Sequence, residues 1–252
     1  ILPILVEGLS RLEYRGYDSA GVAFKKNGSI SVTKNLGRVN QLTKKLNLKT
    51  NQSNLGIAHT RWATHGIPSE KNAHPHYSKN IFLVHNGIIE NHSDLKAYLK
   101  AEGIKFSTQT DTEVIAHLIR TFTEKGQSFE KAVFNSIKKL KGAYALGIID
   151  KKDPEQIIGV RNQSPLVLGQ GFQENCIASD VMALAPVTNK FVYLDDGQVA
   201  LLTNQKAVVK NISSKTVRTK TYEVDSNAYT NDMAGYSHFR EKEIFLFCFA
   251  LN

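Results

Sequence analysis

The chain has 252 residues, of which 41% are hydrophobic and 22% are charged, as is ordinary for a globular protein with a sizeable core. Its formal net charge of +9 comes from lysines spread over many segments without interleaved aromatic residues, so no nucleic-acid interface is expected. The two cysteines, Cys176 and Cys248, are too few for a disulfide framework, and a cytoplasmic setting is expected. No apolar run reaches the roughly 20 residues that span a bilayer, so no membrane association is expected.

Apolar spacing and turn residues predict the elements in chain order. Leucines at positions 2, 5, 9 and 12 share one face of a helix at the start of the chain. Asn27-Gly28 then separates two strand-like segments, which is a strong signal for a hairpin. Further helices are expected at 38–46, 93–102, 111–125 and 128–140, and further strands at 55–60, 81–85, 143–150, 156–161, 166–169, 175–179, 191–194 and 198–203.

Helices grouped in the middle of the chain, with strands on both sides, favour an α+β fold in a single domain. Cys176 lies in a predicted strand, and we interpret it as a packed core thiol rather than a nucleophile. Residues 231–244 are polar and compatible with a helix. Residues 245–252 form a short apolar run at the end of the chain, apart from the expected domain of residues 1–244.

Five of the eight histidines, at positions 59, 65, 74, 76 and 85, fall in one short stretch. Imidazole is the commonest metal ligand, so a metal site is the first candidate. The spacing lacks the i, i+4 helical pair of a zincin, no carboxylate accompanies the histidines closely, and Arg61 would repel a cation. No metal is therefore expected.

A site for an anion and an amide fits the same stretch better. Arg61 offers a planar fork of donors suited to a carboxylate. Asn86 and Gly87 follow a predicted strand and can present a side-chain amide and a backbone N–H to a developing oxyanion. Asp111 could receive an ammonium group, although an ordinary helix N-cap is the plainer interpretation. This is the outline of an amidohydrolase for glutamine or asparagine, but no cysteine or serine-elbow nucleophile accompanies it.

Eight short motifs in order make the chain resemble a known family. They are YRGYDSAG (14–21), HTRWATHG (59–66), NAHPH (72–76), HNGIIEN (85–91), TDTEVIAH (110–117), KGAYAL (141–146), RNQSPL (161–166) and ASD (178–180). Together they resemble the class II glutamine amidotransferase domain of glutamine–fructose-6-phosphate aminotransferases, also called glucosamine-6-phosphate synthases. Amidotransferases of purine, asparagine or glutamate synthesis resemble the chain less in the first two motifs.

The resemblance implies an N-terminal-nucleophile hydrolase with a four-layer αββα sandwich and no cofactor. It also implies roles for individual residues. Arg61 would bind the α-carboxylate of glutamine and Asp111 its α-amino group, while Asn86 and the Gly87 N–H would form the oxyanion hole. The remaining implied site residues are Thr64 and His65 in a loop that closes over glutamine, Trp62 as a gate for ammonia, and Arg15 and His74 near the site.

Two departures from the family shape the expected activity. The family begins with Cys-Gly-Ile-Val-Gly on a strand before the first helix, and this strand, with its nucleophile, is not part of the 252 residues. The sugar-isomerase domains, through which the family uses fructose 6-phosphate and forms homodimers, are not part of them either. We therefore expect the chain by itself to be inactive as a glutaminase. The alternative is a non-catalytic glutamine-binding or regulatory module.

Overall fold

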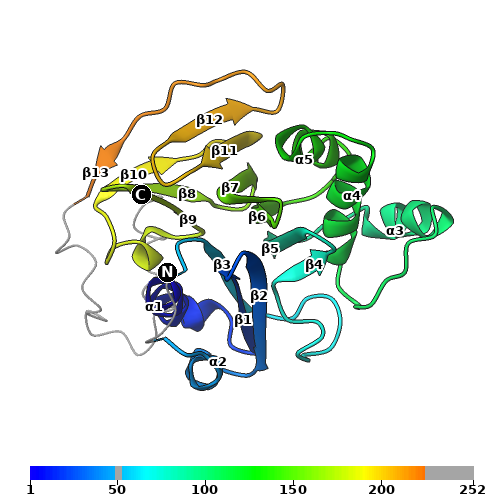
Figure 1. The fold of residues 1–252 in the computed structure, drawn as a ribbon, viewed down its shortest axis with the longest axis horizontal. Coiled ribbons are helices and arrows are strands. Elements are labelled where there is room, and N and C mark those ends of the chain that lie inside the picture. Colours follow the sequence, from blue (N-terminus) through cyan, green and yellow to red (C-terminus); the bar gives the residue numbers. More distant parts are fainter. Residues whose placement is uncertain (49–52, 225–252) are drawn as a thin grey trace, which may run out of the picture.

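A computed structural model describes residues 1–48 and 53–224, which form an α+β fold of four layers (Figure 1). One of the two inner layers is the central sheet, a six-stranded antiparallel sheet in the order β12-β11-β7-β6-β5-β4. Its strands are β4 (His76–Ser78), β5 (Ile81–Gly87), β6 (Tyr144–Asp150), β7 (Asp153–Asn162), β11 (Gln198–Leu202) and β12 (Ala207–Asn211). Its strand β6 is buried along its whole length because both of its faces are covered.

Two smaller sheets face this central sheet. The first has the order β2-β1-β3, with β1 (Ser19–Lys26), β2 (Ser29–Leu36) and β3 (Gly56–Arg61). The second has the order β13-β10-β8-β9, with β8 (Val167–Gly171), β9 (Glu174–Ala178), β10 (Lys190–Tyr193) and β13 (Tyr222–Glu223). Among the described residues, β3 and β9 are therefore edge strands with one hydrogen-bonded neighbour each.

Helices form the two outer layers. The helices α3 (His92–Ala101), α4 (Glu113–Glu124) and α5 (Phe129–Ile137) cover the six-stranded sheet, and α1 (Leu2–Leu12) and α2 (Val39–Lys45) cover the first small sheet (Figure 1). Two short 3-10 helices, Glu13–Arg15 and Val181–Ala183, complete the helical elements of the described chain. Separate apolar clusters fill the spaces between the layers, as expected for stacked elements that each bury one face.

The four-layer α+β architecture expected from the sequence is confirmed, as is the first hairpin. Asn27 and Gly28 both have positive φ angles, 49° and 72°, as a tight turn of this kind requires. The side chain of Ser128 caps α5, because it accepts a hydrogen bond from the Lys131 N–H. The strands β4, β12 and β13 were not predicted, and each is five residues or shorter.

Two predicted helix starts are wrong. The helix expected at residue 93 begins at His92 with Asn91 as its N-cap, and the helix expected at Asp111 begins at Glu113 with Thr112 as its N-cap. The predictions for residues 231–244 and for the tail 245–252 lie outside the described residues.

Candidate active site

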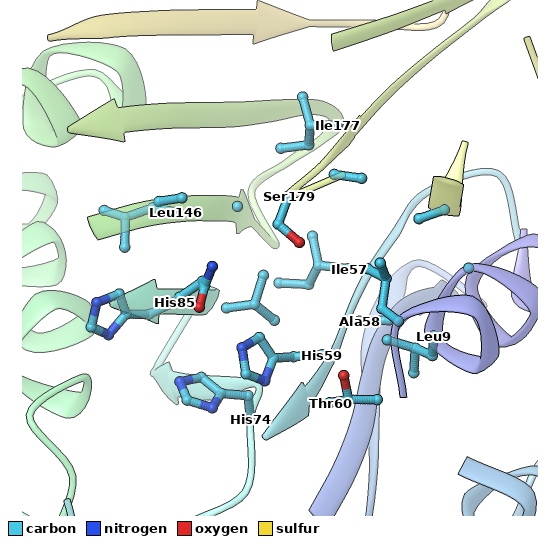
Figure 2. A pocket seen from close by; sticks show the side chains of 18 of the residues that line it. Leu9, Ile57, Ala58, His59, Thr60, His74, His85, Leu146, Ile177 and Ser179 are labelled. Atoms are coloured by element: carbon cyan, nitrogen blue, oxygen red, sulfur yellow. The ribbon is translucent and has the colours of Figure 1, made fainter. Parts of the chain in front are cut away.

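A cavity of about 510 Å³ lies where the two small sheets meet the six-stranded sheet. Strand β3 lines one side, β9 lines the opposite side, and β5 and β6 lie across the cavity from α1 (Figure 2). The volume lies within the range of small-molecule sites, and most of the lining is apolar, for example Leu9, Ile57, Leu146 and Ile177. Histidines and the other polar candidates occupy one part of it. All nine residues singled out from the sequence line this cavity, namely Arg15, Arg61, Trp62, Thr64, His65, His74, Asn86, Gly87 and Asp111.

Arg61 ends strand β3 and is only 4% exposed. Its Nη2 donates hydrogen bonds to the backbone oxygens of His65 (2.5 Å) and Gly66 (3.1 Å), so it holds the following loop in place. Its Nη1 is buried and has no hydrogen-bond partner among the described residues. Burial lowers the pKa of the guanidinium, against the raising effect of the Asp18 and Asp111 carboxylates. A buried cation with a free donor is well suited to bind an anionic group.

Asp18 was not singled out from the sequence, although it lies within the motif at residues 14–21. Its Oδ1 lies 3.9 Å from Arg61 Nη1, and its Oδ2 accepts a hydrogen bond from the Ala63 N–H. It therefore supports both the arginine and the loop that follows it. No local pattern could have indicated this role, because the contact joins residues 45 positions apart in the chain.

Asn86 and Gly87 end strand β5, opposite Ala145 and Tyr144 of β6. Gly87 has a φ angle of 133°, and a Cβ atom added there would lie 2.1 Å from the backbone oxygen of Ala143. Only glycine allows this close approach of two backbone segments. The same Ala143 oxygen accepts a hydrogen bond from the Ile88 N–H at 2.8 Å, which fastens the end of β5 to the turn before β6.

Asp111 lies in the loop before α4 and is 4% exposed. Its Oδ2 accepts the Ile89 N–H at 2.8 Å, so the carboxylate is bound to the segment after Gly87 rather than to its own helix. The interpretation of Asp111 as an N-cap is therefore wrong. The site brings together a cation, a carboxylate and an asparagine–glycine pair from β3, the α4 loop and β5.

Four histidines, at positions 59, 74, 76 and 85, pack beside these groups. The ring centroids of His59 and His74 (Figure 2) are 4.2 Å apart, and those of His74 and His76 are 4.7 Å apart. Burial lowers the pKa of His59 and of His76 to about 3 and that of His85 to about 4, and it lowers the pKa of His74 well below its usual value. All four rings are therefore neutral at pH 7.

In residues 1–48 and 53–224, no group of three or more His, Cys, Asp or Glu side chains is arranged to hold a metal ion. No helix in the same part of the chain is long and apolar enough to cross a membrane.

The remaining candidates are more exposed than these buried groups. Trp62 is 48% exposed and packs edge-on against Tyr17, with ring centroids 5.6 Å apart. His65 packs against His92 of α3 with centroids 5.1 Å apart, and Thr64 is exposed. Arg15 forms an ion pair with Asp180 at 3.1 Å, which joins the first motif of the sequence to the last. The structure places these residues around the cavity, and their individual roles stay predictions.

Cys176 is the one cysteine within the described residues and lies on β9 in the cavity wall. It is half-buried and packs against the apolar cluster of Val167, Leu184 and Phe191, as expected for a packed thiol. Burial and, to a smaller extent, the Glu174 carboxylate raise the pKa of its thiol to about 11. Such a thiol is almost entirely protonated at neutral pH and is a poor nucleophile.

The four layers and the cavity define the class of the protein, which is the class II glutamine amidotransferases with the N-terminal-nucleophile hydrolase fold. A solved structure of glutamine phosphoribosylpyrophosphate amidotransferase from B. subtilis is similar, with a TM-score of 0.73 and 26% identity over 86% of this chain and 48% of that one. A second structure, of the allosteric regulatory enzyme of purine biosynthesis, has a TM-score of 0.70 and 26% identity over 83% of this chain and 46% of that one.

A family profile described as a glutamine amidotransferase domain matches residues 59–186, about half of the chain, and the chain belongs to this family. Curated relatives named glutamine–fructose-6-phosphate aminotransferase (isomerizing) include those of Shewanella oneidensis and Thermococcus kodakarensis. Both are 46% identical to this chain, over 97% and 96% of it respectively. The chain spans 40% and 41% of the length of these two relatives.

Proposed function

We propose that the cavity binds glutamine in one orientation. Arg61 Nη1 receives the α-carboxylate, the Asp111 carboxylate receives the α-ammonium group, and Asn86 with the Gly87 N–H receives the oxygen of the side-chain amide. Thr64 and His65 belong to the loop that closes over the substrate, and it is this loop that Arg61 Nη2 holds by its backbone.

The observation that carries this proposal is the unused hydrogen-bonding capacity of two buried, oppositely charged groups in one cavity. Arg61 Nη1 has no hydrogen-bond partner among the described residues, and Asp111 lies in the wall of the same cavity with only Oδ2 engaged in a recorded hydrogen bond. Burying both charges is costly unless each finds a partner. An α-amino acid, which carries one charge of each sign, would satisfy both groups at once.

We further propose that this domain releases ammonia from glutamine for the conversion of fructose 6-phosphate to glucosamine 6-phosphate. The support is the name shared by relatives that match nearly the whole chain. Because the chain spans about 40% of their length, the sugar-phosphate chemistry and homodimerisation belong, in this proposal, to further domains. Trp62, at the exposed rim, would gate the passage of ammonia toward them.

Hydrolysis needs a nucleophile that the described residues do not offer. Cys176 is unsuitable because its pKa is about 11. We propose that the nucleophilic cysteine comes from a strand of the kind that the family carries before its first helix, and that this strand lies between the edge strands β3 and β9. Both edges line the cavity, and its apolar lining suits an extended apolar segment. The 252-residue chain by itself would then bind glutamine without hydrolysing it.

The alternative is a glutamine-binding or regulatory module without catalysis, and the raised pKa of Cys176 favours it for the chain alone. Two measurements separate the proposals. The first is calorimetric titration of the chain with glutamine, in which Arg61→Ala and Asp111→Ala should abolish binding. The second is a glutaminase assay on a chain extended by a Cys-Gly-Ile-Val-Gly strand. Binding without turnover in the extended chain would refute the enzymatic function and leave the binding module, whereas no glutamine binding in either chain would refute both.

A further inference from the structure

A buried threonine hydroxyl joins the two ends of the proposed glutamine site. Thr112 Oγ1 lies 3.1 Å from His74 Nε2 and 3.0 Å from His85 Nδ1. All three side chains are at most 5% exposed. His85 directly precedes the amide-binding pair at the end of β5, and Thr112 directly follows the carboxylate Asp111. The contact therefore ties the strand that would bind the amide to the loop that would bind the ammonium group.

Counting hydrogens restricts how this contact is made. A hydroxyl has one hydrogen to donate, and Thr112 Oγ1 has no other recorded partner among residues 1–48 and 53–224. Both imidazoles are neutral at pH 7 because burial disfavours their charged forms, so each ring carries one N–H. Leaving the buried O–H without an acceptor is costly, so the hydroxyl donates to one ring and its oxygen accepts from the other. Since it meets Nδ1 of one ring and Nε2 of the other, both rings must have the same tautomer.

We infer that Thr112 is a positioning residue for the amidotransferase site, whose hydroxyl locks His74 and His85 in one shared tautomer and couples β5 to the Asp111 loop. The effect on glutamine binding rests on the proposed function, whereas the shared tautomer does not. The locked pair fixes the distance between Asn86 with Gly87, which would bind the amide, and Asp111, which would bind the ammonium group. It also leaves His74 Nδ1 and His85 Nε2, which have no partner among the described residues, as one donor and one acceptor in the wall of the cavity (Figure 2).

The tautomers can be read directly by nuclear magnetic resonance. In the full chain labelled with ¹⁵N-histidine, two-bond ¹H–¹⁵N correlations at pH 7 identify the protonated nitrogen of each ring. We expect His74 and His85 to be both Nδ1–H or both Nε2–H, in the wild type and in Thr112→Ser. Opposite tautomers in the wild type would mean that the hydroxyl accepts from both rings, and this would overturn the inference. Averaged tautomers in Thr112→Val, which keeps the shape and removes the hydroxyl, would support it.

Glutamine titration tests the coupling. Thr112→Val should weaken binding roughly 10-fold, the equivalent of one lost hydrogen bond, and Thr112→Ser should restore it to within about 3-fold. The matched control is Thr121→Val on the same helix, whose hydroxyl bonds only the His117 backbone, and it should bind as the wild type does. Equal binding by Thr112→Val and the control would refute the coupling. If the wild type itself does not bind glutamine, the proposed function fails, and the tautomer spectra still decide whether the threonine locks the pair.

Discussion

Replacing Gly87 with alanine tests whether the end of β5 depends on a close backbone approach. The added Cβ would lie 2.1 Å from the Ala143 oxygen, and because an ordinary contact begins at 3.4 Å, about 1.3 Å of backbone movement is needed. This movement breaks the 2.8 Å hydrogen bond from the Ile88 N–H to the same oxygen. The positive φ of 133° adds strain of about 1–3 kcal/mol. With about 1 kcal/mol for the lost hydrogen bond, the free energy of unfolding should fall by about 2–4 kcal/mol.

The matched control is Gly126→Ala. This glycine has a φ angle of 82° after α4, and a Cβ there would meet nothing within 4 Å. This substitution should lower the free energy of unfolding only by the conformational penalty of a side chain at positive φ, about 1 kcal/mol. Urea unfolding followed by circular dichroism gives both values. Equal midpoints for the two variants would refute the argument, because the carbonyl contact would then contribute nothing.

Three further predictions follow from the site. Arg61→Lys should weaken glutamine binding in calorimetry at least 10-fold, because an ammonium group cannot hold the loop and a carboxylate at once; unchanged affinity would contradict this. In the folded chain, His59 and His85 have pKa values of about 3 and about 4, whereas a histidine in the unfolded chain has a pKa of 6.5. Below pH 6.5 the unfolded chain therefore binds more protons than the folded chain. The contribution of these rings to stability in urea unfolding should be constant above pH 7 and fall between pH 6.5 and 5 by up to about 1.4 kcal/mol per unit for each ring, and a flat profile between pH 6.5 and 5 would exclude this. In a Cys248→Ser background, Cys176 should react with iodoacetamide at pH 7.5 roughly 100-fold more slowly than an ordinary thiol, and an ordinary rate by mass spectrometry would argue against its raised pKa.

The sequence predicts the long, periodic elements of this fold and misses those that tertiary contacts create. The hairpin at Asn27-Gly28 and the cap at Ser128 are local chemistry, so they can be read from neighbouring residues. Strand β4 is three residues long and exists because β5 pairs with it. Asp111 has the position of an N-cap in the sequence but bonds a residue 22 positions earlier.

The same limit holds for the site. Arg61, Asn86, Gly87 and Asp111 were selected by residue type and motif, and the structure gathers them in one cavity. Thr112 could not be selected in this way, because its role depends on two histidines 27 and 38 positions distant. Motifs thus indicate the groups that would touch a ligand, whereas the groups that orient them become visible only when the chain is folded.

The cavity between β3 and β9 is a gap between strand edges, which has a practical consequence for work on this chain. Glutamine would fill only the polar part near Arg61 and Asp111, and the apolar part of the cavity, lined by Leu9, Ile57 and their neighbours, would stay unfilled. Fluorescent dyes that bind in apolar cavities should therefore bind the folded chain. Melting curves recorded with such dyes would start at high fluorescence. This high initial signal would come from the cavity between β3 and β9 of the folded protein rather than from misfolded sample.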